Sequence, residues 1–300
     1  MIPPQFDYER PTSLDAALDA VAPPDAVPLA GGHDLIPMLK ARSVSPGTVV
    51  DLGGLDELRG VERVADEGDT TTEQLSVGAL TTDADLLDAA PTGADALLDA
   101  TRAVGDAQIR NRGTVGGNLA AAHPASDIPA ATLAADATLH LVGPDGDREV
   151  SAEGFATGDH ETVRASDELL TRISVPLAPD AGSAYARKTH PSTGYAAVGV
   201  AARLRVVDGV VIGPRVAAVG LCDAPTRLAA VEDRLAGADA GAPVEAVESA
   251  TTRAGDGVDA PVREDHIVSA DQRRALLPKY AEQAVSEALA RAVGREGVVA

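Results

Sequence analysis

The chain has little cysteine: Cys222 is the only one among 300 residues. A single cysteine excludes a disulfide bond within the chain, and it excludes an iron–sulfur cluster held by four thiolates of this chain. Flanked by Leu221 and Asp223, Cys222 is interpreted as a buried apolar thiol rather than a nucleophile. The six histidines lack a metal-ligand spacing such as H-x-x-x-H, so redox chemistry here would require an organic cofactor.

Lysine and long apolar runs are scarce as well. Lysine occurs only at Lys40, Lys188 and Lys279, and 46 acidic residues against 25 basic ones give a formal net charge of −21. So acidic a chain disfavours nucleic acid and anionic membranes as partners. No apolar run approaches the roughly 20 residues that span a bilayer. The first seven residues do not resemble a secretory signal, so we expect a cytoplasmic protein without an integral membrane segment.

The pattern of apolar and polar residues predicts an α+β fold. A length of 300 residues and a hydrophobic fraction of 45% allow a sizeable core and favour about two domains. Strands alternate with helices up to about residue 177. After a connector at residues 178–183, we expect strands at 195–204, 210–214 and 215–221, then helices near 228–235, 244–254 and 270–293.

Two loops share a glycine pair followed by a polar side chain: residues 29–35, LAGGHDL, and residues 109–119, IRNRGTVGGNL. Glycine lets the backbone approach a ligand closely, and N–H groups can hold phosphate oxygens without a positive charge. Neither loop has the spacing of a Rossmann or P-loop motif. Alone, the first loop is better explained as an ordinary tight turn. Together, the two loops could close on one diphosphate from opposite sides.

Three charged residues near the second loop each have two candidate roles. The Asp127 carboxylate could accept hydrogen bonds from a ribityl or ribose hydroxyl, or it could cap the helix that contains Pro129. Arg110 and Arg112 could bind an anion. In so acidic a protein, however, surface ion pairing is the favoured use of both arginines.

With these motifs, the chain resembles the FAD-binding medium subunits of molybdenum hydroxylases, and it looks most like those of aerobic carbon monoxide dehydrogenases. The matching segments follow the family order from residue 6 to about residue 290. They are residues 6–8, 30–38, 78–82, 105–119, 124–127 and 194–196. An ordered series of this length is far more specific than either glycine pair.

The resemblance implies a domain organisation. Residues 1–177 would form an FAD-binding domain of two α/β subdomains, about 1–57 and 58–177, with the flavin between them. Residues 178–290 would form a C-terminal domain with a three-stranded antiparallel sheet and a helical bundle. Residues 291–300 would be a tail.

The resemblance also implies which residues contact FAD. The two loops would hold the diphosphate, with bare backbone at Gly116 and Gly117, and Asp127 would contact polar groups of the cofactor. Leu170, or less favourably Leu169, would lie against the isoalloxazine, and Tyr195 matches an aromatic near the flavin. The full set of expected contacts is Leu29, Ala30, Gly31, Gly32, His33, Asp34, Leu35, Thr114, Gly116, Gly117, Asn118, Asp127, Leu170, Arg187, Lys188 and Tyr195.

Two positions depart from the family pattern. Relatives often have serine or threonine in place of Asp34, so its carboxylate either turns away from the diphosphate or binds a bridging cation or water. Arg187 aligns with a lysine of many relatives, and Lys188 is its neighbour. Either cation would stabilise negative charge on a reduced flavin.

The function implied by the resemblance is electron transfer. A large subunit would carry the molybdenum cofactor and a small subunit the iron–sulfur clusters, in a dimer of heterotrimers, and electrons would pass through FAD on this chain to an external acceptor. We expect no catalytic residue and no metal ligand here. Alternatives are an FAD subunit of a xanthine dehydrogenase-type or aromatic acyl-CoA reductase complex, a free-standing flavin oxidase, or a scaffold that has lost FAD.

The acid excess and the lack of lysine suggest a salt-rich cytoplasm, where screening suppresses self-repulsion. We therefore predict a higher midpoint of thermal unfolding in molar KCl than in dilute buffer, as measured by circular dichroism. Equal midpoints in the two solutions would contradict this interpretation.

Overall fold

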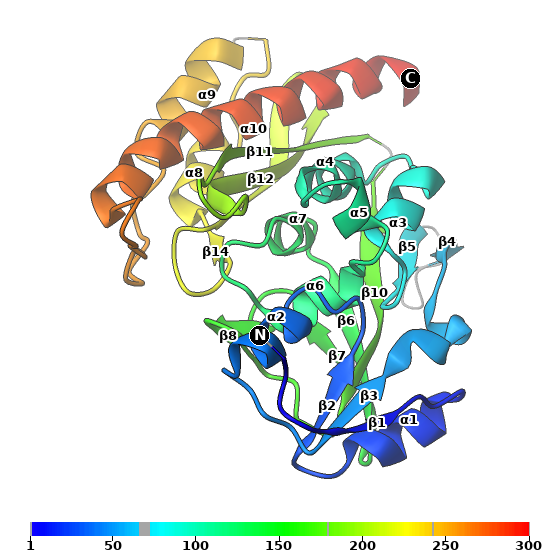
Figure 1. The fold of residues 1–300 in the computed structure, drawn as a ribbon. Helices are drawn as coiled ribbons and strands as arrows, with labels where there is room; N and C mark the ends of the chain where they lie inside the picture. Colours follow the sequence, from blue (N-terminus) through cyan, green and yellow to red (C-terminus); the bar gives the residue numbers. More distant parts are fainter. Residues whose placement is uncertain (1, 66–72, 179, 242, 300) are drawn as a thin grey trace.

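The structure is a computed structural model that describes residues 2–65, 73–178, 180–241 and 243–299. Its N-terminal part is a small parallel sheet in the order β1-β3-β2 (Figure 1). The strands are β1 (Asp7–Glu9), β2 (Ala26–Leu29) and β3 (Thr48–Asp51). Helix α1 (Leu14–Val21) packs on β2 and β3, and α2 (Leu35–Ala41) connects these two strands. The Ser13 hydroxyl caps α1 by accepting a hydrogen bond from the Ala16 N–H group, at 3.3 Å.

The middle part is a five-stranded antiparallel sheet in the order β4-β5-β10-β6-β7. Its strands are β4 (Val61–Ala65), β5 (Glu73–Gly78), β6 (Thr138–Gly143), β7 (Gly146–Ser151) and β10 (Leu169–Leu177). Between β5 and β6 the chain forms α3 (Asp83–Ala89), α4 (Asp95–Ala103), α5 (Ala107–Arg110), α6 (Val115–Ala121) and α7 (Ile128–Ala134). Short elements complete this part: η1 (Leu52–Gly54), η2 (Asp56–Leu58), β8 (Ala156–Gly158) and β9 (Glu161–Thr162).

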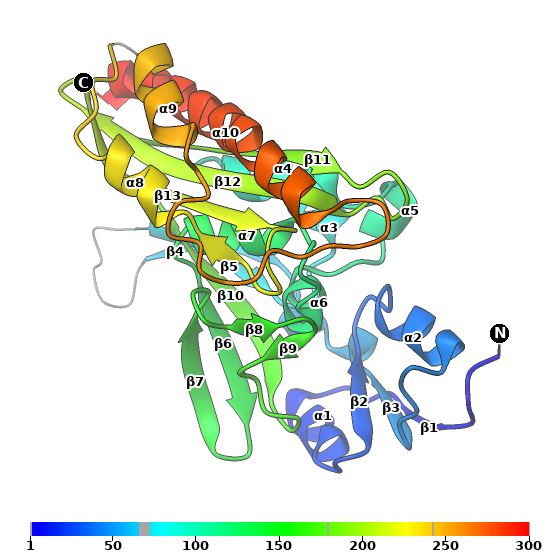
Figure 2. The ribbon, with the colours of Figure 1, turned by 90° about the vertical axis from the view of Figure 1, so that its left-hand side faces the viewer.

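The C-terminal part is a four-stranded antiparallel sheet in the order β11-β12-β13-β14. It consists of β11 (Ala181–Thr189), β12 (Ala196–Val207), β13 (Val210–Val219) and β14 (Thr226–Arg227), followed by α8 (Ala229–Leu235), α9 (Pro243–Thr251) and α10 (Ala270–Val299). Figure 2 shows α10 lying along one face of the sheet, beside α8 and α9. On the other side, α4 and α7 contact its strands, so helices from the first half of the chain pack on the C-terminal sheet.

These elements confirm the expected α+β fold and correct four details. The C-terminal sheet has four strands instead of the expected three. Residues 181–183 of the expected connector belong to β11, a strand that the sequence reading missed; Pro179 lies outside the described residues. Residues 210–214 and 215–221 were expected as two strands but form the single strand β13. Its register against β12 shifts between Arg203 and Arg205, opposite Gly213 and Pro214, because a bulge accommodates these two residues. The expected tail after residue 290 is helical up to Val299.

The expected division after residue 177 remains a prediction. The change from the middle sheet to the C-terminal sheet, between β10 and β11, supports it. One apolar cluster nevertheless joins the two parts, because Ala196, Ala201 and Ala217 pack with residues of the middle sheet and its helices. Cys222 is buried, as expected. Within the described ranges, no helix has the length and apolarity that crossing a membrane requires.

Glycine at position 182 lets β11 pack closely on α10. A Cβ atom built at Gly182 would overlap the Ala288 carbonyl oxygen and the Ala292 nitrogen of α10. We predict that Gly182→Ala lowers the free energy of unfolding by about 1–3 kcal/mol, measured by denaturant titration. Gly255→Ala is the control, because its Cβ would meet nothing closer than a Leu277 methyl group at 3.8 Å. Wild-type stability of Gly182→Ala would refute this close packing.

Candidate functional site

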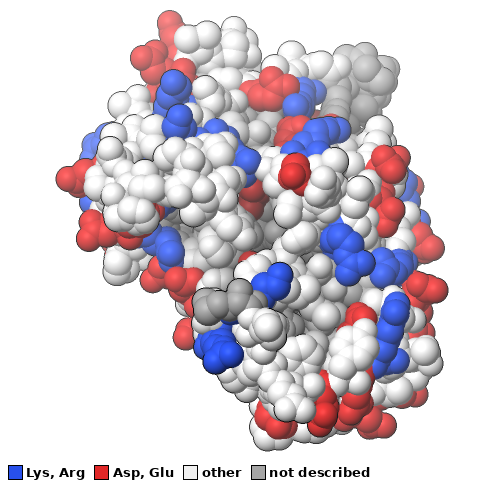
Figure 3. All heavy atoms as spheres, in the orientation of Figure 1, with Lys and Arg blue, Asp and Glu red and all other residues white. Residues whose placement is uncertain are grey.

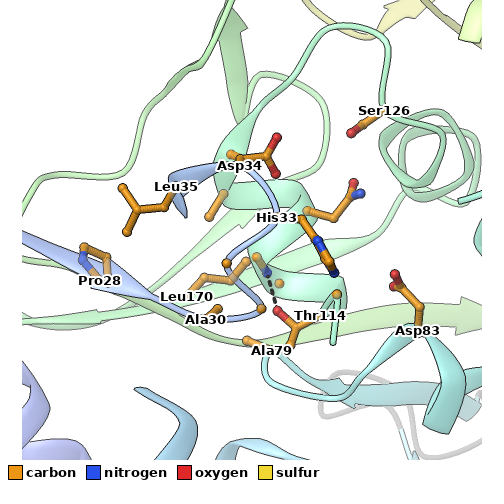
Figure 4. Close-up of a pocket in the computed structure, with 18 of the residues that line it drawn as sticks. Pro28, Ala30, His33, Asp34, Leu35, Ala79, Asp83, Thr114, Ser126 and Leu170 are labelled. Carbon is orange, nitrogen blue, oxygen red and sulfur yellow. Dashed lines mark hydrogen bonds between the residues drawn. The ribbon is translucent and has the colours of Figure 1, made fainter. Parts of the chain in front are cut away.

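The two glycine loops touch each other. A Cβ atom at Gly31 would overlap the carbonyl oxygen of Arg112 and would lie 2.9 Å from the Cα atom of Gly113. His33 strengthens the contact, because its Nε2 atom lies 2.9 Å from the carbonyl oxygen of Ile109. The joined loops line a cavity of about 560 Å³, which is within the usual size range of small-molecule sites (Figure 4).

The first loop lines this cavity and has unpaired backbone donors. Gly32 has a φ of 84°, in the left-handed region that glycine adopts readily. The carbonyl groups of Gly32 and Asp34 accept the first hydrogen bonds of α2. No acceptor among the described residues bonds the N–H groups of Gly32, His33, Asp34 or Leu35. These orphan donors fit the oxygens of a diphosphate.

The second loop uses its backbone differently from our expectation. The N–H group of Gly116 donates to the Ala79 carbonyl oxygen at 2.9 Å, and that of Gly117 donates to the Thr114 hydroxyl at 3.1 Å, the dashed line in Figure 4. Gly116 is a glycine because a Cβ there would overlap Ala79. These glycines therefore serve close packing and capping rather than presenting free N–H groups. The polar group that remains is the Asn118 amide, whose buried Oδ1 has no partner within the described chain.

Asp127 is held by two side chains of β11. Its carboxylate accepts hydrogen bonds from the Tyr185 hydroxyl at 2.5 Å and from the Arg187 guanidinium at 2.6 Å. Asp127 precedes α7 but makes no side-chain capping bond, so the capping role is not realised. Burial raises the pKa of Asp127, whereas Arg187 and Tyr185 act in the opposite direction.

Asp34 turns toward Tyr195. The Tyr195 hydroxyl donates to Asp34 Oδ1 at 3.4 Å, and the Tyr195 ring stacks on His123 with ring centres 4.0 Å apart. Burial, together with the Asp34 charge, raises the pKa of Tyr195 to about 12. Burial lowers the pKa of His123, which favours the uncharged ring. Tyr195 therefore remains a hydrogen-bond donor at neutral pH.

All but three of the expected contact residues line the cavity. Leu29 lies at the end of β2 outside the lining, Arg187 reaches the site only through Asp127, and Lys188 is exposed. Both Leu169 and Leu170 contribute apolar surface. The sequence reading missed several lining residues, which include Pro28, Asp83, Ser126, His160, Arg164 and Glu168.

Among the missed residues, Asp83 has the most unusual environment. Its side chain is 1% exposed, and its Oδ1 atom has no hydrogen-bond partner among the described residues. Burial raises the pKa of this carboxyl to about 7, although the positive charge of Arg110 opposes the increase. Figure 4 shows Asp83 on the same side of the loops as His33. The position directly after the helix cap Thr82 gives no signal of this burial in the sequence.

The expected ion pairing of Arg110 and Arg112 is wrong for the described part of the chain. The Arg110 guanidinium donates to the carbonyl oxygens of Val104 at 2.8 Å and Gly105 at 3.1 Å, which fixes the turn before α5. Arg112 has neither an ion pair nor a side-chain hydrogen bond with any described residue.

Comparisons with known proteins place the chain among flavin-binding relatives. Residues 4–178 match the model of the FAD binding domain in molybdopterin dehydrogenase. The chain is 36% identical to the carbon monoxide dehydrogenase medium chain of Hydrogenophaga pseudoflava over 76% of its own length and 78% of that chain. It is also 36% identical to the glyceraldehyde dehydrogenase medium chain of Sulfolobus acidocaldarius, over 79% and 83%. A solved carbon monoxide dehydrogenase from H. pseudoflava superimposes with a TM-score of 0.87 at 34% identity, covering 97% of this chain and 99% of that one.

The raised pKa of Asp83 has a consequence for stability. The folded state binds the Asp83 proton more tightly than the unfolded state, so this group makes the fold less stable as pH rises from about 4 to about 7. We predict that Asp83→Asn removes this loss. The free energy of unfolding of the variant, relative to wild type, should rise by up to about 4 kcal/mol over that range, as measured by urea denaturation.

Asp88→Asn is the matched control, because Asp88 is exposed on the same helix. A stability difference between Asp83→Asn and wild type that does not change with pH would show that Asp83 ionises normally in the fold.

Proposed function

Because this chain belongs to the family of FAD-binding domains in molybdopterin dehydrogenases, we propose that it is the FAD-carrying electron-transfer subunit of a molybdenum hydroxylase complex. FAD, when bound, accepts electrons from one redox partner and delivers them to another. The chain's own residues hold and orient the cofactor and shape its surroundings. The observation that carries the proposal is the cavity where the two glycine loops meet, with unpaired N–H donors on one loop.

The donor set of this cavity fits FAD. The cofactor combines an apolar ring system with an anionic diphosphate, and the lining offers Leu169 and Leu170 for the former. For the diphosphate we propose the N–H groups of residues 32–35 and the Nδ2 group of Asn118, which lines the cavity. The unpaired Oδ1 atom of Asn118 is an acceptor and suits a hydroxyl group of the cofactor instead. Backbone donors neutralise an anion without a cation, which suits a lining poor in lysine.

We further propose that Asp34 takes part through its backbone. Its carboxylate is engaged with Tyr195, which leaves the N–H group for the diphosphate and keeps the negative charge away from it. In the same way, Arg187 acts as a positioning residue. It holds the Asp127 carboxylate, which lines the cavity and can accept hydrogen bonds from hydroxyl groups of the cofactor.

The relatives are medium chains of larger enzymes, which supports the presence of partner subunits. We propose a large subunit with the molybdenum cofactor and a small subunit with iron–sulfur clusters, assembled as a dimer of heterotrimers. Carbon monoxide is our first candidate substrate, because carbon monoxide dehydrogenases recur among the relatives in both sequence and structure. A glyceraldehyde dehydrogenase chain has the same 36% identity, however, so the large subunit must decide the substrate. The acidic surface supports a salt-rich cytoplasm as the location.

Gly117→Val tests the proposed placement of FAD. A Cβ atom at Gly117 would lie 3.3 Å from the Cβ of Ala30 on the opposite loop, so a valine would occupy the space between the loops. We predict that the wild-type chain takes up FAD and shows a flavin absorption spectrum, and that the variant binds FAD at least about tenfold more weakly.

Gly255→Val is the control for general effects of the substitution, since Gly255 is exposed, lies outside the cavity lining, and a Cβ atom there would meet nothing closer than a Leu277 methyl group at 3.8 Å. Normal FAD affinity of Gly117→Val would show that the second loop does not face the diphosphate. A wild-type chain that remains colourless after incubation with FAD would contradict the function itself.

A further inference from the structure

A second, smaller cavity of about 290 Å³ adjoins the two glycine loops. Ala30, Leu80 and Thr114 line both cavities, so these residues form part of the wall between them. We call the smaller space the basic cavity, because three arginines line it: Arg10, Arg59 and Arg112. They come from the segment after β1, the segment after η2 and the turn after α5, respectively.

The basic cavity has an excess of positive charge. Asp51 is the one carboxylate among its described lining residues, and it is already engaged. It accepts hydrogen bonds from the Tyr8 hydroxyl and from the Gly53 N–H group, and its Oδ2 lies 3.7 Å from Arg10 Nε. The Arg59 guanidinium donates to the Leu80 carbonyl oxygen at 2.9 Å. Its carboxylate partner is Asp56, at 3.6 Å, whose side chain is 95% exposed.

Arg112 is the distinctive member of this group. Its backbone is fixed, because its carbonyl group packs against Gly31. Its guanidinium has no partner within the described part of the chain. Arg112 is an exposed residue, and what distinguishes it is that it lines the cavity beside Arg10 and Arg59 without a carboxylate partner of its own among the described residues. Figure 3 shows several basic side chains on the right of the molecule, below the position of α5 in Figure 1, with acidic side chains beside them at the edge.

We propose that the basic cavity binds a small phosphate-bearing anion, with Arg112 as its main ligand and Arg10 and Arg59 in support. A guanidinium matches two phosphate oxygens at once, and the charge of phosphate suits several cations. The side-chain amide of Asn111 adds a neutral donor to the lining. A single chloride would leave most of the cavity to water, since one water occupies about 30 Å³ in the liquid.

The experiment is a titration of the purified full-length chain with inorganic phosphate and, separately, with glycerol phosphate. Binding is measured by calorimetry at a fixed ionic strength set with KCl, with and without saturating FAD. FAD displaces any phosphate held by the flavin loops, so the binding that persists with FAD reports the basic cavity. If the chain takes up no FAD, the arginine variants alone identify the phosphate site. Failure of the FAD proposal can therefore be distinguished from failure of the phosphate proposal.

We expect Arg112→Gln to weaken the FAD-insensitive binding at least about tenfold. Arg112→Lys should retain part of the affinity, because lysine keeps the charge but loses the two-point contact. Arg274→Gln is the matched control: it removes the same charge from an exposed arginine whose partner is Asp271 on α10. A preference for phosphate or glycerol phosphate identifies which source of the group the cavity accepts.

Two results would overturn the proposal. One is that the variants do not single out Arg112. Either Arg112→Gln binds phosphate with wild-type affinity, or Arg274→Gln loses as much affinity, which would mean a general effect of net charge. The other is a wild-type chain that binds neither anion. If Arg112→Gln then also failed to co-purify with partner chains, the basic cavity would be assigned to an acidic protein surface instead.

Discussion

The contact between the two glycine loops is the constraint on which the site depends. Gly31 must lack a side chain for its loop to reach the backbone of Arg112 and Gly113. This contact brings the end of β2 beside the start of α6, although 85 residues lie between Leu29 and Val115 along the chain. The same contact walls off the flavin cavity on one side and the basic cavity on the other. One close approach of backbones thus creates both candidate binding sites.

The two loops differ in how their backbone N–H groups are used. The first loop leaves its N–H groups unpaired, whereas the second loop uses its own to pack against Ala79 and to cap α6 through Thr114. The second loop, whose N–H groups are paired, therefore packs against a first loop whose N–H groups remain available to a ligand. The strongly acidic composition makes this arrangement useful, because backbone donors and a few fixed arginines provide positive potential locally while the chain as a whole carries −21.

The sequence predicted most elements and both loops, since apolar periodicity and glycine pairs are local signals. It missed β11, whose alanine, glycine and charged residues have weak strand preference and are held by pairing with β12. It divided β13 because a bulge at Gly213 and Pro214 looks like a turn. The burial of Asp83 and the lack of a partner for Arg112 among the described residues could not be predicted either, because both depend on residues distant in sequence. Thirteen of the expected contacts line one cavity. They were predicted from the ordered family motifs, because hydrophobic periodicity carries no information about them.

The central claim is that FAD bound to this chain passes electrons between two redox partners in a molybdenum hydroxylase complex. Purification of the complex from its native source, with analysis of bound cofactors and metals, tests it most directly. We predict that the chain co-purifies with a large and a small partner and that the complex contains FAD, molybdenum and iron. A flavin-free monomer, or a flavoprotein that turns over substrate without partners, would contradict the account.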